Sequence, residues 1–171
     1  MQNTRTLLAV GMVLGTLGNA LAQQAPAKTA AALTGLDHAE IQSLYGQYAH
    51  YFDSCADNGL AFARLFAPDG VFILPGGRAI EGRDKLTEFA RCPAGVTRRP
   101  TQHWISSIMI VPAAEGAAGT AYVMQVNAAE PKLATSGNRY EDIFVKGPDG
   151  WAFKRHSVVP TLKGPAPSAP Q

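Results

Sequence analysis

The chain has 171 residues, with 15 Lys and Arg against 13 Asp and Glu, and two cysteines. A chain of this length builds one domain with its own core rather than two. Its nearly balanced charge excludes the strongly basic surface that a nucleic acid or an anionic membrane requires, so we expect neither as a partner.

Residues 1–22 have the pattern of a secretory signal peptide. Arg5 precedes an uncharged apolar run over residues 7–17, and Ala20-Leu21-Ala22 matches the small-x-small pattern that signal peptidase cleaves. The run is shorter than the ~20 apolar residues of a spanning helix, which argues against a membrane anchor. We therefore expect cleavage after Ala22, secretion to the periplasm, and no membrane attachment afterwards.

The rest of the chain divides by composition into a linker, a domain and a tail. Residues 23–35 are small and Ala-rich, and they predict a linker. Residues 163–171 are Pro-rich and cannot bury enough surface to offset the entropy of ordering them. We expect a single folded domain over residues 36–162.

The first predicted helix begins at Asp37. This residue fits the N-cap position, Glu40 completes a capping box, and Leu36 and Ile41 fit a hydrophobic staple. One face of the helix is apolar at helical spacing and consists of Ile41, Leu44, Tyr45, Tyr48, Ala49 and Phe52. Asp53 follows on the flank of this face in the last turn, where it is either a solvated helix-end residue or a proton-transfer group.

The elements after this helix change from helical to strand patterns. We expect a short helix over 60–66, a turn at 67–70, a hairpin of strands over 71–74 and 78–82, a third helix over 83–91, and four long strands near 103–111, 119–128, 139–146 and 151–159. Helices first and antiparallel strands last predict an α+β domain, with helices covering one face of a curved sheet.

The last two strands are joined by "GPDG" and are predicted to form a hairpin. Strict alternation from the turn places Asp142 opposite Arg155, as a buried ion pair with a structural role first and a place in a pocket wall second. His156 then falls on the other face opposite Glu141, as a surface pair or an oligomer contact.

The two cysteines and the four histidines indicate whether a disulfide or a metal site is expected. Cys55 and Cys92 each follow a predicted helix, and they either form a disulfide or remain two buried thiols. The histidines include no pair at i, i+4 spacing, and neither a Gly-rich phosphate loop nor a Gly-x-Ser-x-Gly motif occurs. We expect no metal and no cofactor.

Three stretches, "LFAPDGVF", "IEGRDKLTEF" and "RYEDIFVKGPDGWAFKRH", resemble the SnoaL-like branch of the nuclear transport factor 2-like (NTF2-like) superfamily. The resemblance covers nearly the whole expected domain. It implies a cone-shaped roll, in which a curved antiparallel sheet wraps around the long first helix and leaves an apolar pocket at the open end. Enzymes of this superfamily carry out cofactor-free acid/base chemistry there, whereas other members only bind ligands or partners.

The resemblance also implies a catalytic pair. Asp53 matches the acidic residue near the end of the first helix, and His103 matches the histidine that begins the strand after the third helix. A histidine whose other ring nitrogen is held by a carboxylate can take a proton from a carbon next to a carbonyl. The expected pocket lining adds Tyr48, Phe52, Trp104, Gln125, Tyr140, Asp142 and Arg155. The two tyrosines are either donors to a developing enolate oxygen or core residues with satisfied hydroxyls.

Three functions are compatible with these residues, and an enzyme or a binding protein fits them better than an assembly module. The first is a secreted acid/base enzyme, an isomerase, dehydratase or cyclase acting on a small apolar carbonyl compound. The second is a non-catalytic periplasmic binding or accessory protein, and the third is an assembly module that uses the outer face of the sheet. The second histidine of some dehydratases of this fold is absent, since Gln125 and Asn127 stand in that strand. We expect a homodimer or another small homo-oligomer.

Overall fold

The computed structural model describes residues 30–127 and 136–161. The predicted signal peptide and Pro-rich tail lie outside these ranges, as does most of the predicted linker. The helical elements are α1 (Gly35–Asp53), the 3-10 turn η1 (Ala56–Gly59), α2 (Leu60–Ala63) and α3 (Arg83–Ala90). The strands are β1 (Phe66–Ile73), β2 (Ala79–Glu81), β3 (Thr101–Ala113), β4 (Gly116–Asn127), β5 (Ser136–Gly147) and β6 (Gly150–Pro160).

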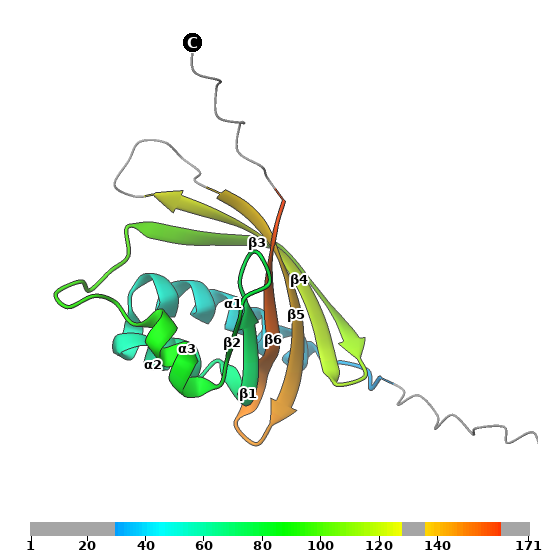
Figure 1. Ribbon diagram of the computed structural model, residues 1–171. Helices are drawn as coiled ribbons and strands as arrows, with labels where there is room; N and C mark the ends of the chain where they lie inside the picture. The colour runs from blue at the N-terminus through cyan, green and yellow to red at the C-terminus, as the bar shows by residue number, and fades with distance from the viewer. Residues whose placement is uncertain (1–29, 128–135, 162–171) are drawn as a thin grey trace, which may run out of the picture.

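The described strands form one curved sheet with the order β2-β1-β6-β5-β4-β3. Helix α1 lies in the hollow of this sheet, and α2 and α3 sit beside it (Figure 1). The predicted α+β cone is therefore confirmed, with one correction: the sheet is mixed, because β1 pairs with β6 in parallel. The predicted turn at 67–70 is a register irregularity inside β1, between Phe66 and Val71.

Helix α1 begins one turn earlier than predicted. Thr34 is the N-cap, its hydroxyl accepts the backbone N–H of Asp37 at 3.2 Å, and the Asp37 carboxylate accepts the backbone N–H of Thr34 at 2.8 Å. The same carboxylate accepts bonds from Lys146 and Trp151 on the β5–β6 hairpin, which explains why Asp37 takes the inner position of the capping box. The predicted staple does not form, since Leu36 is 65% exposed.

Aromatic side chains fill the space between α1 and the sheet. The buried rings come from both layers and comprise Tyr45, Tyr48, Phe62, Phe66, Phe72, Tyr140, Phe144 and Phe153. The packing is so close that a Cβ at Gly119 on β4 would lie 2.6 Å from the Tyr45 hydroxyl. Only a glycine allows the helix and the sheet to approach this closely at that point.

The register of the last hairpin corrects the prediction for Asp142. Phe144 pairs with Phe153 as expected, but the register then shifts, so that Asp142 pairs with His156 and Arg155 pairs with Ile143. The cause is a β-bulge at Lys154, which lies between the two residues paired with Ile143 and Phe144. Strict alternation would bury one of two consecutive cations, whereas the bulge leaves Arg155 exposed and turns His156 inward, where it is 0% exposed.

Candidate active site

Asp53 and His103, the residues predicted as the catalytic pair, lie in direct contact. Asp53 is the last residue of α1, and His103 is the third residue of the edge strand β3. One oxygen of the carboxylate is 2.6 Å from Nδ1 of the imidazole, and the other accepts the backbone N–H of His103 at 2.8 Å. Because the carboxylate holds both the ring and its backbone, the orientation of the imidazole is fixed.

A chain of hydrogen bonds continues from the other ring nitrogen. Nε2 of His103 lies 2.9 Å from Nε2 of Gln125. The Ser136 hydroxyl donates to Oε1 of Gln125 at 2.8 Å and accepts from Nδ2 of Asn138 at 3.3 Å. Since the serine proton points at the amide oxygen, the amide NH₂ faces the imidazole, and Nε2 of His103 is the acceptor. The network therefore assigns the ring proton to Nδ1, next to Asp53.

Two tyrosines of the predicted lining stand beside this pair. The Tyr48 ring centroid lies 5.9 Å from that of His103 and 5.4 Å from that of Tyr140. The hydroxyls of Tyr140 and Tyr48 are hydrogen-bonded to each other, and burial raises the pKa of both phenols well above the usual range. Both groups therefore stay neutral at physiological pH. Phe52 packs edge-on against the imidazole at 5.5 Å.

A second aspartate–histidine contact lies deeper in the cone. Nδ1 of His156 is 2.7 Å from Oδ1 of Asp142, both side chains are 0% exposed, and the contact lacks hydrogen-bond alignment. The Tyr45 hydroxyl donates to the other oxygen of Asp142 at 2.6 Å. Nε2 of His156 has no hydrogen-bond partner among the described residues. The rings of Tyr140 and Tyr48 lie 4.3 and 4.7 Å from the imidazole.

This second pair was missed from the sequence, where His156 was expected on the surface and Arg155 in the pocket wall. Both expectations are wrong, since His156 is fully buried and Arg155 lies on the outer face. The consecutive charges Lys154 and Arg155 inside a strand were the available signal, because alternation cannot place both in water without a bulge.

A cavity of about 580 Å³ adjoins the first pair. Its lining includes Asp53, Arg98, Gln102, His103 and Trp104, from the end of α1, the preceding loop and the start of β3. This volume lies within the range of small-molecule sites. Of the other predicted lining residues, Tyr48 and Tyr140 belong to the aromatic interior, Gln125 to the hydrogen-bonded chain, and Asp142 to the second pair.

A disulfide joins the segments that follow α1 and α3. Cys55 and Cys92 are bridged with a Cα separation of 5.8 Å, within the range that a disulfide spans, so the bridge is the alternative that the structure adopts. Cys55 has a positive φ of 54°, and Asp57 and Asn58 follow with φ of 48° and 52°. Non-glycine residues rarely occupy this region, so the connection that follows Asp53 is conformationally restricted.

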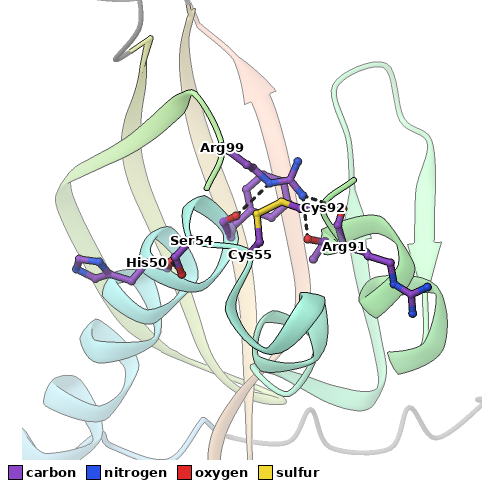
Figure 2. The surroundings of a disulfide bond; sticks show 8 residues. His50, Ser54, Cys55, Arg91, Cys92 and Arg99 are labelled. Atoms are coloured by element: carbon purple, nitrogen blue, oxygen red, sulfur yellow. Dashed lines mark hydrogen bonds between the residues drawn. A yellow bond between two sulfur atoms is a disulfide. The ribbon is translucent and has the colours of Figure 1, made fainter. Parts of the chain in front are cut away.

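Arg99 ties the same two helix ends together beside the disulfide (Figure 2). Its guanidinium donates to the carbonyl of Phe52 at 3.0 Å and to the carbonyl of Ala90 at 2.8 Å, at the C-terminal ends of α1 and α3. Its backbone N–H donates to the carbonyl of Asp53 at 2.8 Å. A cation at the negative ends of two helices is favourable, and these bonds satisfy carbonyls that the helices leave open.

The described residues contain no cluster of three His, Cys, Asp or Glu side chains able to hold a metal ion. In the described ranges, no helix has the length and apolarity needed to cross a membrane.

Comparison with solved structures gives a consistent fold. A protein of unknown function with a cystatin-like fold from Nostoc punctiforme superposes with a TM-score of 0.66 at 20% identity, covering 79% of this chain and 98% of that chain. A candidate scytalone dehydratase from Novosphingobium aromaticivorans superposes with a TM-score of 0.60 at 22% identity, covering 74% of this chain and 85% of that chain. ActVI-ORFA from Streptomyces coelicolor superposes with a TM-score of 0.59 at 26% identity, covering 74% of this chain and 98% of that chain.

The sequence itself identifies the family. No curated protein matches it significantly. The SnoaL-like domain, in contrast, matches residues 34–157, which include all the helices and nearly all the strands described above. The SnoaL-like resemblance expected from the three sequence stretches is thereby confirmed, and the chain belongs to the SnoaL-like family.

Proposed function

We propose that this chain is a cofactor-free acid/base enzyme of the lyase or isomerase type, acting on a small, largely apolar carbonyl compound. The observation that supports it is the direction of the hydrogen bonds through Asp53, His103 and Gln125. That direction places the proton of the imidazole on Nδ1 and a basic lone pair on Nε2. An orienting carboxylate on one nitrogen and a lone pair on the other are the requirements for a general base.

In the proposed reaction, Nε2 of His103 takes a proton from the carbon next to the substrate carbonyl. The electron pair of that C–H bond moves into the enolate, and Asp53 stabilises the imidazolium that forms. The Gln125 amide, which points its N–H groups at Nε2, can donate to the enolate oxygen once the substrate takes its place there. The imidazolium then returns the proton to another carbon in an isomerisation, or to a departing hydroxyl in an elimination of water.

We also propose that the protein works outside the cytoplasm, in the periplasm. The support is the signal-like pattern of residues 1–22 together with the Cys55–Cys92 bridge. Disulfides persist in oxidising compartments and are rare where thiols are kept reduced.

The alternative function is that of a non-catalytic ligand-binding or accessory protein. This alternative is favoured by the burial of His103. Its side chain is only 3% exposed, and its Nε2 is already hydrogen-bonded to the Gln125 amide. A substrate must displace that amide to reach the lone pair, whereas a ligand that fills the adjoining cavity needs no such displacement.

The two functions are separated by ligand binding combined with hydrogen exchange. Native mass spectrometry of the purified protein identifies a bound small molecule, and a panel of small cyclic ketones and β-hydroxy ketones in D₂O reports exchange of acidic C–H protons. We expect exchange with the parent protein, and a roughly 10²- to 10⁴-fold slower rate in His103→Asn at nearly unchanged affinity. His38→Asn, at an exposed histidine on α1, is the matched control and should leave the rate unchanged.

Binding without exchange in the parent protein would instead support the accessory-protein function and reject the enzyme.

A further inference from the structure

Arg98 and Arg99 are consecutive residues of the loop before β3, and their side chains differ in what they contact. The Arg99 guanidinium donates to backbone carbonyls at the ends of α1 and α3 and lies 4.1 Å from the centre of the Phe52 ring. Arg98, in contrast, is exposed and lines the cavity beside the candidate active site. Its side chain has no ion-pair or hydrogen-bond partner among the described residues. One arginine is therefore structural, whereas the other is available to a ligand.

The loop that carries Arg98 is fixed against the end of α1. On one side of Arg98, the disulfide joins Cys92 to Cys55, which lies two residues beyond Asp53. On the other side, the backbone N–H of Arg99 donates to the carbonyl of Asp53 at 2.8 Å. Since Asp53 belongs to the candidate catalytic pair, these contacts keep Arg98 next to that pair whichever rotamer its own side chain takes.

The other charges of the cavity do not neutralise Arg98. The lining contains one carboxylate, that of Asp53, and both of its oxygens are already bonded to His103. The lining also contains His50, an exposed histidine in the last turn of α1. The wall thus carries a permanent positive charge, a further imidazole and no carboxylate oxygen without a partner. Such a wall favours an anionic ligand.

The chemistry of the lining indicates which kind of anion fits. A guanidinium presents parallel N–H groups that match a carboxylate in a bidentate pair. One arginine balances one negative charge, whereas a phosphate monoester carries about two at neutral pH. Much of the remaining lining is small or aromatic and consists of Ala49, Tyr51, Ala56 and Trp104. These side chains suit the flat apolar body of a cyclic or aromatic compound.

We propose that Arg98 binds a carboxylate group of the substrate, and that the substrate is a cyclic or aromatic oxo acid. This inference rests on the proposed function, because it places the ligand in the cavity beside His103. It narrows the substrate class from small apolar carbonyl compounds to those that carry one carboxylate. The carboxylate pairs with Arg98, and the carbonyl part of the same molecule faces His103. Arg98 is thus a specificity-determining residue and takes no part in proton transfer.

The test uses pairs of probes that differ only in the acid group. They are 4-oxocyclohexanecarboxylate with its carboxamide, and 3-acetylbenzoate with 3-acetylbenzamide. Dissociation constants are measured by NMR titration at neutral pH on the full chain as recovered from the cell, with its disulfide intact. In at least one pair we expect the parent protein to bind the carboxylate roughly 10- to 100-fold more tightly than the amide, because only the carboxylate forms a charge-assisted bidentate pair.

Substitution of Arg98 should remove this preference. In Arg98→Gln the carboxylate should bind roughly 10- to 100-fold more weakly and the amide as before, and Arg98→Lys should be intermediate because it keeps the charge without the bidentate geometry. Arg78→Gln is the matched control. Arg78 is also exposed and without an ion-pair partner in the described part of the chain, but it lies between β1 and β2, outside the cavity. This variant should bind both probes like the parent.

Binding and C–H exchange of the same probes in D₂O are measured separately, so that the enzyme and the carboxylate site can fail separately. An Arg98-dependent preference without exchange would support the carboxylate site and reject the enzyme. Exchange without a preference in either pair would keep the enzyme and overturn the carboxylate site. Where exchange occurs, Arg98→Gln should raise KM and leave kcat nearly unchanged, because the pair with the carboxylate is the same in ground and transition state.

Two further outcomes would overturn the carboxylate site. A preference that persists in Arg98→Gln would show that another group holds the acid. Failure of both carboxylates to bind the parent protein at about 10 mM would show that the cavity does not select an oxo acid.

Discussion

Asp53–His103 and Asp142–His156 are both aspartate–histidine contacts inside one cone, and they differ in access and in hydrogen bonding. In the first pair the side chains are 11% and 3% exposed, both ring nitrogens have partners, and a cavity lies alongside. In the second pair both side chains are fully buried, and neither ring nitrogen of His156 makes an aligned hydrogen bond among the described residues. The same two residue types thus form a hydrogen-bonded pair beside a cavity in one place and a fully buried contact in the other.

The largest expected effect comes from removing the carboxylate of each pair. Asp142→Leu should lower the free energy of unfolding by about 3–5 kcal/mol, because the Tyr45 hydroxyl is left buried without its acceptor and the His156 ring loses the carboxylate beside it. Asp53→Leu should cost only about 1–2 kcal/mol, since water from the cavity can reach the groups it exposes. Urea denaturation of both variants measures the difference, and equal losses would remove the distinction between the pairs.

The disulfide should matter to the first pair alone. Replacing Cys55 and Cys92 together by alanine should lower the free energy of unfolding by about 2–4 kcal/mol, through the added freedom of the unfolded chain. Because Cys55 lies two residues beyond Asp53, the NMR signals of the His103 ring should shift, and those of His156 should not. Shifts of equal size at both rings would show that the bridge supports the whole cone instead of the site.

Alkaline pH probes the tyrosines around the second pair. Burial, reinforced by the Asp142 carboxylate, raises the pKa of Tyr45, and burial also raises those of Tyr48 and Tyr140. A phenol whose pKa is raised on folding contributes stability that is complete below its unfolded value near 10 and is lost as the pH rises above it. Each tyrosine should therefore cost about 1.4 kcal/mol of stability per pH unit above pH 10, or about 4 kcal/mol per unit for the three.

Unfolding followed by circular dichroism between pH 9 and 12 measures this slope. Tyr140→Phe should reduce the slope by about one third. A slope that is the same in this variant as in the parent would mean that Tyr140 ionises alike in the folded and unfolded protein, contrary to its burial.

The smallest expected effect concerns the orientation of Gln125. Ser136→Ala removes the hydroxyl that points the amide NH₂ at His103 and should cost no more than about 1 kcal/mol of stability. Long-range ¹H–¹⁵N spectra at a pH where the ring is neutral should show the Nδ1–H form of His103 in the parent and a mixture of the two neutral forms in the variant. The tautomer of His156 should not change. A parent spectrum with the proton on Nε2 would contradict the proposed base.

Local sequence patterns determined the elements and their order. The apolar repeat from Ile41 to Phe52 specifies α1 because side chains three and four residues apart share one helix face. The "GPDG" turn specifies the β5–β6 hairpin because its residues favour the required backbone angles. The family pattern, in turn, pointed to Asp53 and His103, which the fold brings together from positions 50 residues apart.

Tertiary structure alone decided the choices in which several local patterns were equally good. Thr34 and Asp37 both fit an N-cap, and bonds from Lys146 and Trp151 across the molecule decided between them. Whether Cys55 and Cys92 form a bridge depended on the distance between two helix ends. The bulge that turns His156 inward depended on the cost of burying Arg155 against rings from α1 and β1, a cost that exists only once those elements have packed.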